Sequence, residues 1–524
     1  MKKYRFISVF VFLLGYFFYL VSEILSLPKG AGYFYPVDDV YIHLEVAKNI
    51  ADNFLFSINS NSFDPASSSI LYSFLLSLLI KVFGNSSYYP LFINLTFGIL
   101  ASFYAANFVV YQYGKKFALF FALLLQPLAM IYLSSILGME HTLHIFLIVL
   151  FFIFYNKLAS GDLKAFSYIL IVVFFLGAVR FESVFFISAV IFVLIGQKKF
   201  KQGLLIGLVG FSPMIVYGIY SLLMGGLFFP NSVLVKSNFH VSDLESLITM
   251  LKSKFLSMDY IKYLLPFSIF YLMYAFSRYR NVKLQRVFEM EALPIIILLT
   301  SYGQLIFGIM TFRYENYLMI AYLFIVIKIC DFYFKTSDFS IPKLFTVLFI
   351  GYSVVFGLFK MYWYHPVLYT DSKNLYYNQY KLAQFLKKYY HSETIVANDI
   401  GAITYFANIE VLDMYGLGST DVAKYKYNNS GENDFSYFMG ELSNRKNARI
   451  AAIYPEWFVG QIPKNWILVG KWKMNDFRNP NIRYVNFYAV TKNDIPYLRK
   501  SLKEFNIITS QDKSYTSKLL SPVR

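Results

Sequence analysis

Long apolar runs separated by short polar connections make up most of residues 1–364. A helix needs about 20 mostly apolar residues to cross the hydrocarbon core of a bilayer, which is about 30 Å thick. Backbone polar groups in lipid must find partners within the chain, so each run is expected to be helical. The pattern predicts about eleven membrane-spanning helices, at approximately residues 6–25, 89–111, 117–137, 142–156, 165–179, 183–196, 203–224, 260–277, 291–311, 315–330 and 343–362.

The apolar positions change their period near residue 371. Residues 380–390 have the period of an amphipathic helix, whereas short strands are predicted at 394–397, 410–413, 450–454 and 484–490. We therefore expect an α-helical polytopic membrane domain over residues 1–364 and a soluble α/β domain over 365–524. A large polar loop, residues 26–88, separates the first two predicted spans.

The net charge of +17 is distributed as clusters in every second connection rather than along one face. The positive-inside rule places these clusters and the N-terminus in the cytoplasm, and the 26–88 loop and the C-terminal domain outside. A nucleic acid is not expected as a partner, whereas the lipid bilayer is. The clustered residues are Lys2, Lys3, Arg5, Lys115, Lys116, Lys157, Lys164, Lys198, Lys199, Lys201, Arg278, Arg280, Lys283, Arg286, Lys335 and Lys343.

Two adjacent carboxylates, Asp38 and Asp39, lie just beyond the first predicted span, and an amphipathic helix is predicted over residues 40–54. One interpretation makes the pair a helix N-cap with a solvated charge. The other makes one aspartate a general base, with its neighbour adjusting the pKa. The pair alone does not decide between them.

Further ionisable residues interrupt the apolar runs, where a charge is costly enough to indicate function or pairing. In the predicted topology they lie on the same face as the aspartates, which suggests one polar cavity with carboxylates for acid/base chemistry and arginines for phosphate. The alternative is ion pairing at helix ends, for example between Arg180 and Glu182. The residues are Glu140, Arg180, Glu182, Arg313 and Glu315.

The external loop over residues 225–258 adds two candidates. Asn231 could orient sugar hydroxyls, and Lys236 could meet an anionic head group, although a turn followed by a polar surface loop is the simpler interpretation. The histidines do not have the spacing of a zinc site, so no metal site is predicted. No nucleotide-binding motif is found.

Several segments of the sequence, taken in order along the chain, resemble the GT-C integral-membrane glycosyltransferases. The similarity is to the bacterial branch that resembles the mycobacterial arabinofuranosyltransferases and related enzymes that use polyprenyl-phosphate sugars. Phe181 and His141 depart from the residues common in that branch. The matching segments are Asp38-Asp39-Val40-Tyr41-Ile42, Ala47-Lys48-Asn49-Ile50-Ala51, Ser68-Ser69, Leu71-Tyr72, Gly138-Met139-Glu140, Arg180-Phe181-Glu182, Pro230-Asn231, Lys236, Arg313-Tyr314, Asn398-Asp399-Ile400-Gly401-Ala402 and Leu412-Asp413-Met414-Tyr415-Gly416-Leu417.

The resemblance implies an inverting transfer of a sugar from a polyprenyl phosphate donor to a cell-envelope glycan, lipid or protein on the external face of the bacterial inner (plasma) membrane. Asp38 or Asp39 would be the base, with Asp38 preferred because it lies nearer the first span. Arg180, Arg313 and Lys236 would bind the donor phosphate. No cofactor beyond the lipid-linked sugar is implied, and the need for a divalent metal is left open.

Other classes of membrane protein remain as alternatives. A transporter or flippase of lipid-linked sugars would place paired charges near the middle of spans and often carry inverted repeats, and neither is visible here. A lipid-linked glycan polymerase or ligase usually carries its large external loop late in the chain. A scaffold whose soluble domain binds a partner is the fourth possibility.

Overall fold

The computed structural model describes residues 2–236, 244–258, 260–308, 313–335, 341–428, 435–474, 483–509 and 517–519. Parts of the predicted 225–258 loop and the end of the predicted 291–311 span lie outside these residues. The chain divides into two compact units. Unit 1 comprises residues 1–21, 90–216 and 237–365, and unit 2 comprises residues 22–89, 217–236 and 366–524.

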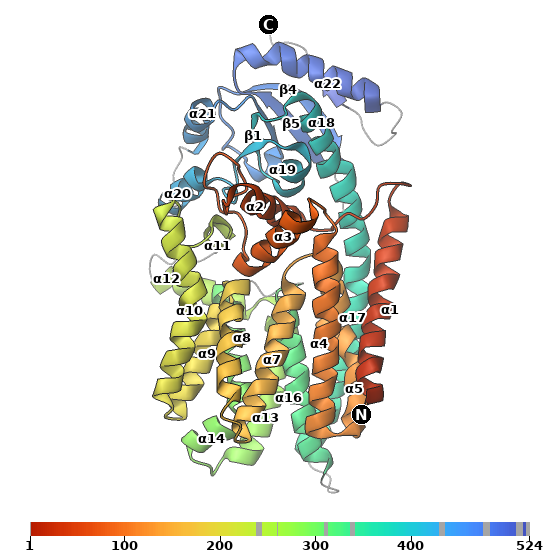
Figure 1. Ribbon diagram of the computed structural model, residues 1–524, viewed down its shortest axis with the longest axis vertical. Helices are drawn as coiled ribbons and strands as arrows, with labels where there is room; N and C mark the ends of the chain where they lie inside the picture. Colours follow the sequence, from red (N-terminus) through yellow and green to blue (C-terminus); the bar gives the residue numbers. More distant parts are fainter. Residues whose placement is uncertain are drawn as a thin grey trace. The chain divides into compact units, whose positions relative to one another are not determined.

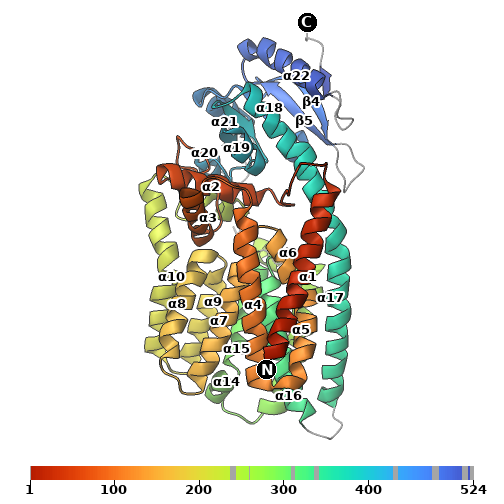
Figure 2. The ribbon, with the colours of Figure 1, turned by 45° about the vertical axis from the view of Figure 1, so that its right-hand side comes forward.

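Unit 1 is built from helices (Figures 1 and 2). Among the described helices, three contribute more than one residue to each unit: α1 (Lys2–Ser26), α10 (Phe200–Leu223) and α17 (Ile341–Asn374). The others that form unit 1 are α4 (Tyr89–Tyr113), α5 (Lys115–Ala129), α6 (Ile131–Ile136), α7 (His141–Ala159), α8 (Ala165–Val179), α9 (Ser183–Gly196), α12 (Leu244–Phe255), η1 (Tyr260–Leu264), α13 (Leu265–Tyr279), α14 (Leu284–Met290), α15 (Ala292–Phe307) and α16 (Asn316–Phe334).

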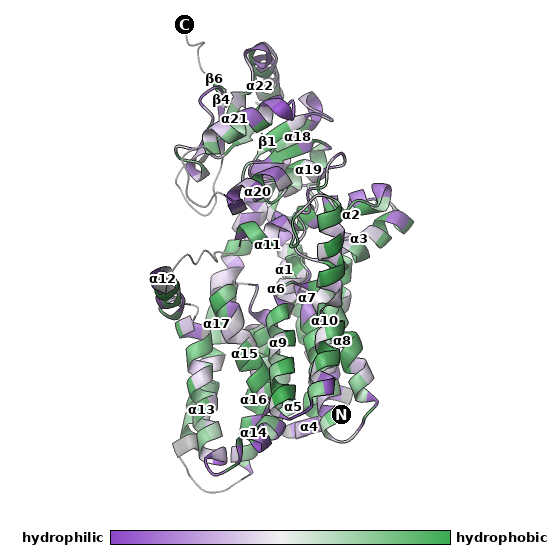
Figure 3. Ribbon diagram, turned by 90° about the vertical axis from the view of Figure 1, so that its left-hand side faces the viewer, coloured by the Kyte–Doolittle hydropathy of each residue, from purple (hydrophilic) through white to green (hydrophobic). Residues whose placement is uncertain are grey.

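Six helices of the described residues are long and apolar enough to cross a membrane, and a seventh span results if α14 and α15, which meet at 90°, count as one. These six lie in α1, α4, α7, α10, α16 and the helical stretch Lys343–Tyr389. The predicted spans 165–179 and 183–196 are present as α8 and α9, but their 15 and 14 residues fall short of the usual crossing length. Figure 3 shows α9 and α16 coloured mainly as hydrophobic.

The predicted 117–137 span is interrupted. Met130 has a left-handed backbone with φ of 47°, which ends α5 and begins the short α6. Pro127, inside α5, lacks the amide hydrogen that would continue the helical hydrogen bonds. A run of apolar residues therefore predicted one helix where the backbone forms two.

Unit 2 contains a six-stranded mixed sheet in the order β2-β1-β3-β5-β4-β6. Strand β1 is parallel to β2 and β3, and the remaining pairs are antiparallel. The predicted strands at 394–397, 410–413, 450–454 and 484–490 are confirmed as β1, β2, β3 and β5. The strands are β1 (Thr394–Ala397), β2 (Glu410–Asp413), β3 (Ile450–Ile453), β4 (Ile467–Met474), β5 (Arg483–Ala489) and β6 (Ser517–Leu519).

Helices from distant parts of the chain complete unit 2. The amphipathic helix predicted at 40–54 is α2, and the predicted helix at 380–390 is α18. Buried side chains such as Val396, Leu412, Met439 and Ile453 form a hydrophobic core against the sheet. The helices are α2 (Asp39–Asn53), α3 (Ile70–Phe83), α11 (Asn231–Lys236), η2 (Leu375–Tyr380), α18 (Lys381–Tyr389), α19 (Gly401–Ala407), α20 (Thr420–Asn428), α21 (Phe435–Arg445), η3 (Pro455–Trp457), η4 (Lys492–Asp494) and α22 (Ile495–Thr509).

Candidate active site

Asp38 immediately precedes α2, and its carboxylate is held by the first turn of α19. The backbone N–H of Gly401 donates to Oδ2 at 2.6 Å, and that of Ala402 donates to Oδ1 at 2.7 Å. The first N–H groups of a helix lack partners within the helix and favour a negative charge. Both oxygens of Asp38 are therefore engaged in joining two segments of unit 2.

Gly401 makes this contact possible. A Cβ atom at that position would lie 2.2 Å from the backbone oxygen of Asp38 and 2.8 Å from its Oδ2. The backbone of Gly401 is not in the left-handed region, so the requirement for glycine comes from close approach rather than from an unusual turn. This is the physical reason for the glycine in the Asn398–Ala402 segment that the sequence pattern singled out.

Asp399 forms a side-chain hydrogen bond with Asp38. Two carboxyl groups can share a hydrogen bond only when one of them carries the proton. Burial and the negative charge of Asp38 raise the pKa of Asp399 well above its usual range. Burial also raises the pKa of Asp38, but the N–H groups of Ala402 and Gly401 oppose that rise. Of the two groups, Asp399 therefore has the pKa that is raised more strongly, which favours its neutral form.

The amide of Gln379, in η2, also donates to Oδ2 of Asp399. The same amide nitrogen donates to the hydroxyl oxygen of Tyr454 at 2.5 Å. Gln379 thus links the side chains of Asp399 and Tyr454. Asp399 lies within a segment of the GT-C resemblance, for which the sequence favoured a turn or domain packing over acceptor binding.

Asp39, the first residue of α2, has a different environment. The Lys236 ammonium lies 3.3 Å from its Oδ1 and 3.4 Å from its Oδ2. The side chains of Asp39 and Lys236 are 22% and 32% exposed. The neighbouring carboxylates thus differ: Asp38 is bound by backbone amides, whereas Asp39 pairs with a lysine and remains in contact with solvent.

Asn231 begins α11, the helix that ends at Lys236, and is fully buried. Its Nδ2 donates to Oγ1 of Thr420, at the start of α20, over 3.3 Å. Its Oδ1 has no hydrogen-bond partner among the described residues. The structure therefore gives Asn231 a packing contact between α11 and α20, and its role toward a sugar stays a prediction.

A second group of charged residues, in unit 1, surrounds Arg180 between α8 and α9. Its Nη1 donates to Oε1 of Glu140, and its Nη2 lies 2.7 Å from Oε1 of Glu182. The Glu140 side chain is 0% exposed, that of Arg180 4% and that of Glu182 26%. The ion-pair alternative for Arg180 and Glu182 is therefore present in the structure, with Glu140 as a further partner.

Arg180 and Arg313 both lie over the ring of Tyr314, at 5.0 Å and 5.2 Å from its centre. Nη2 of Arg313 also donates to the Tyr314 hydroxyl oxygen at 3.3 Å. Close to these arginines, Glu315 is paired with Lys360 at 3.0 Å and is fully buried. Unit 1 thus brings Glu140, Arg180, Glu182 and Arg313 together, and unit 2 brings Asp38, Asp39, Asn231 and Lys236 together.

Asp413 is a further buried carboxylate of unit 2 that the sequence left without a role. It accepts hydrogen bonds from the backbone N–H of Tyr415 at 2.7 Å and of Gly418 at 2.9 Å. Burial raises its pKa to about 6. Within the described ranges, no three His, Cys, Asp or Glu side chains are arranged to hold a metal ion.

Known proteins provide the next comparison. A family model described as "Domain of unknown function (DUF8728)" matches residues 373–490. No curated protein matches the chain. The crystal structure of ArnT from Cupriavidus metallidurans bound to undecaprenyl phosphate is similar over 92% of this chain and 98% of that one, with a TM-score of 0.53 and 10% sequence identity.

The chain has the GT-C fold. At 10% identity the likeness to ArnT shows this fold alone. The structure of an Archaeoglobus fulgidus oligosaccharyltransferase in complex with Zn and sulfate is also similar, over 94% of this chain and 74% of that one. Its TM-score of 0.46, at 15% identity, is too low to carry an argument.

The GT-C fold, together with the apolar helices, identifies a multi-pass membrane protein. The GT-C part of the sequence resemblance is thereby confirmed, as is the prediction of a helical membrane domain with a small α/β region. The arabinofuranosyltransferase branch and the orientation in the membrane stay predictions.

Proposed function

We propose that the protein is a membrane glycosyltransferase that moves a sugar from a polyprenyl phosphate donor to a glycan, lipid or protein of the cell envelope. The observation that carries this proposal is the aspartate pair at the start of α2, with one carboxylate bound by backbone amides and the other accessible beside Lys236. The GT-C fold supports it, because the ArnT structure is bound to undecaprenyl phosphate.

Asp39 is the proposed general base. A base must accept a proton from the acceptor hydroxyl within hydrogen-bond reach, so the acceptor must be able to approach its carboxylate. Both oxygens of Asp38 already accept strong backbone hydrogen bonds, whereas Asp39 is partly exposed. These contacts favour Asp39 over Asp38, which is the reverse of the preference drawn from the sequence.

The proposed transfer is a single inverting displacement. The acceptor hydroxyl gives its proton to Asp39 as its oxygen attacks the anomeric carbon of the sugar. The bond from that carbon to the phosphate oxygen breaks, and the electron pair leaves with the polyprenyl phosphate. Lys236 is proposed to orient the Asp39 carboxylate and to attract the anionic donor.

Three cations are proposed for the donor phosphate: Lys236, Arg313 and Arg180. Of the two arginines, Arg313 is preferred, since Arg180 already donates to two carboxylates. Glu140 and Glu182 then serve to hold the Arg180 guanidinium rather than to touch the sugar. The distribution of Lys and Arg supports a cytoplasmic N-terminus and an external C-terminal domain.

The experiment is transfer of radiolabelled sugar from a panel of polyprenyl-phosphate donors by membranes that contain the full chain. Asp39→Asn is expected to lower the rate about 10²- to 10⁴-fold, the usual contribution of a general base. Asp52→Asn is the matched control, because Asp52 is an exposed aspartate in the last turn of the same helix. Full activity of Asp39→Asn at normal membrane levels would contradict the proposed base. If the wild type transfers no sugar from any donor, the transferase proposal gives way to the flippase alternative.

A further inference from the structure

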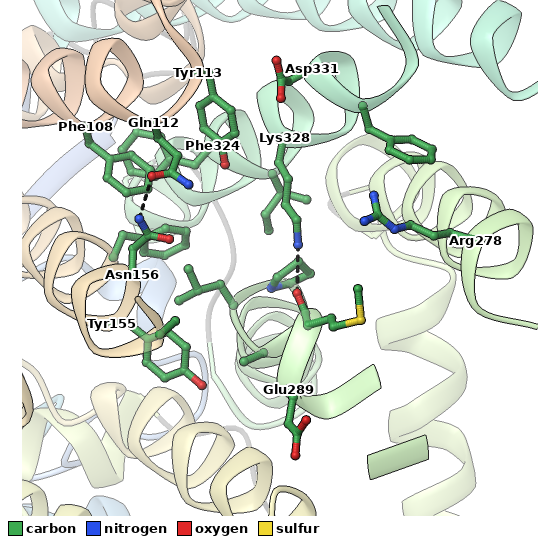
Figure 4. A pocket seen from close by; sticks show the side chains of 18 of the residues that line it. Phe108, Gln112, Tyr113, Tyr155, Asn156, Arg278, Glu289, Phe324, Lys328 and Asp331 are labelled. Carbon is green, nitrogen blue, oxygen red and sulfur yellow. Dashed lines mark hydrogen bonds between the residues drawn. The ribbon is translucent and has the colours of Figure 1, made fainter. Parts of the chain in front are cut away.

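Unit 1 contains a cavity of about 390 Å³ that the transfer reaction does not use. It lies between the ends of α4, α7, α13 and α16 and the start of α15, and its wall includes Gln112, Asn156, Arg278 and Lys328 (Figure 4). This volume falls within the usual range for small-molecule sites, about 300–1,000 Å³.

The lining has two kinds of surface. Phe108, Phe152, Phe324 and Phe332 provide aromatic walls. Polar groups face the same space: Nδ2 of Asn156 donates to Oε1 of Gln112 at 2.7 Å, which leaves further amide positions for a ligand. Such a lining suits an amphiphile with a polar head and an apolar tail.

Arg278 is the cation of this cavity that lacks a carboxylate partner among the described residues. Its Nη1 donates to the hydroxyl oxygen of Tyr274 at 3.1 Å, and the guanidinium lies over the Phe332 ring at 4.3 Å from the centre. A guanidinium has five N–H donors, so most of them remain for a ligand.

The two other cations in the wall are already paired. Lys328 pairs with Glu291 at 2.9 Å, and Lys335 pairs with Asp331 at 2.6 Å. Figure 4 shows the Arg278 side chain extending toward Lys328, whose ammonium donates to the backbone oxygen of Met290 at 3.1 Å, whereas the carboxylate of Glu289 points away from both. Arg278 is therefore the positive charge of this wall that an anion would meet.

The position of the cavity indicates the source of that anion. The helices that form the cavity end at connections rich in Lys and Arg, the connections that the positive-inside rule places in the cytoplasm. Basic pockets between membrane helices on that side commonly bind the head groups of anionic lipids. A soluble phosphate would satisfy the guanidinium but would not cover the aromatic walls.

We propose that this cavity binds the phosphate head group of an anionic glycerophospholipid, with Arg278 as the phosphate-binding cation and Gln112 and Asn156 as partners for the glycerol hydroxyls. The site is independent of the proposed sugar transfer. Arg is suited to the task because its planar fork can hold two phosphate oxygens at once.

The test is native mass spectrometry of the full chain in detergent with added phosphatidylglycerol or phosphatidylcholine. The wild type should bind the first phosphatidylglycerol more tightly than phosphatidylcholine, and Arg278→Gln should weaken that step about tenfold, the effect of losing a charged hydrogen bond. Arg280→Gln is the matched control, because Arg280 lies two residues away, is exposed and does not line the cavity. Equal binding by all three proteins, or equal loss in both variants, would overturn the proposal.

A second variant keeps the test decisive if Arg278→Gln does not accumulate. Ala159 lines the cavity and is exposed to it, so Ala159→Phe should fill the space without changing a charge and should also weaken phosphatidylglycerol binding. Unchanged binding by Ala159→Phe would contradict the site. Inorganic phosphate in large excess should not displace the bound lipid, and displacement would show a soluble anion to be the ligand instead.

Discussion

The charged residues before α2 and α19 in unit 2 are mostly carboxyl groups, whereas in unit 1 Arg180 lies between two glutamates. In unit 2, the backbone N–H groups of Gly401 and Ala402 accommodate the negative charge of Asp38, and the raised pKa of Asp399 favours its neutral form. In unit 1, opposite charges compensate each other among apolar helices. The first arrangement can change its protonation state, and the second stabilises one fixed state. We therefore assign proton transfer to unit 2, where Asp39, the proposed base, adjoins Asp38.

The largest effect on stability is expected for Arg180→Met. Removal of this guanidinium takes away the arginine partner of the buried Glu140 carboxylate. Loss of one member of a buried ion pair lowers the free energy of unfolding by about 3–5 kcal/mol. Thermal unfolding of the purified protein in detergent measures the loss. The double variant Glu140→Met with Arg180→Met should recover part of it, since no buried charge then remains unpaired at that position. A melting temperature of Arg180→Met equal to that of the wild type would refute this role.

The next largest effect on stability is expected where Gly401 packs closely against Asp38 in unit 2. Gly401→Ala places a Cβ atom 2.2 Å from the Asp38 backbone oxygen, and the forced displacement should cost about 1–3 kcal/mol. Gly351→Ala in α17 is the matched control, because a Cβ there meets nothing within 4 Å. That control should be neutral or slightly stabilising, as alanine favours a helix. Equal unfolding temperatures for the two variants would show that the contact between Asp38 and α19 is not tight.

Asp399→Asn is expected to change how the stability of the folded protein depends on pH. The folded-state pKa of Asp399 is raised by burial and by Asp38, so the folded protein holds a proton that the unfolded chain releases near the usual aspartate pKa of about 4. Wild-type stability should therefore fall as pH rises from that value through the raised pKa.

The asparagine variant should show less of this decline, and its unfolding temperature should be followed from about pH 4 to about pH 8. Asp413, whose pKa is about 6, contributes to the same window in both proteins and cancels in the difference. The hydrogen bond between Asp399 and Asp38 contributes only about 0.5–1.5 kcal/mol to the free energy of unfolding. Parallel pH profiles for the wild type and Asp399→Asn would argue against a shared proton.

The smallest effect on stability is expected for Lys236→Met. The Asp39–Lys236 pair is partly exposed, and such pairs contribute about 0.2–1 kcal/mol. The unfolding temperature should hardly change, while transfer from the anionic donor should slow. A large loss of stability would instead assign Lys236 to the structure of unit 2.

Much of the fold could be predicted from the length of the apolar runs and from the spacing of apolar positions along the chain. The ends of α4, α7, α10 and α16 lie close to those predicted, because the length of an apolar run itself determines a membrane helix. Strand β4 was missed, since its alternation is broken by a bulge between Leu468 and Gly470 and its second half carries the half-buried Lys471 and Lys473. The break at Met130 depends on a local backbone conformation that hydropathy does not report.

The candidate site was less accessible from sequence. The sequence identified four charged residues as candidates, because a charge beside an apolar run is costly. They are Asp38, Asp39, Arg180 and Arg313. What separates Asp38 from Asp39, however, is the contact with Gly401, which is 363 residues away along the chain. Pairing of Arg180 with Glu182 was foreseeable from their spacing, whereas Glu140 is 40 residues distant from Arg180. Contacts of that range depend on the tertiary structure.

We propose that Asp39 is the general base and that Asp38 holds α19. The most direct test is to measure sugar transfer and thermal stability together for Asp39→Asn and Asp38→Asn. Asp39→Asn is expected to abolish most transfer with little change in unfolding temperature, because the ion pair of its carboxylate with Lys236 is partly exposed. Asp38→Asn should lower the unfolding temperature, because an amide cannot accept both N–H groups at α19. If Asp38→Asn removes transfer at wild-type stability and Asp39→Asn remains active, the base is Asp38 and the assignment is contradicted.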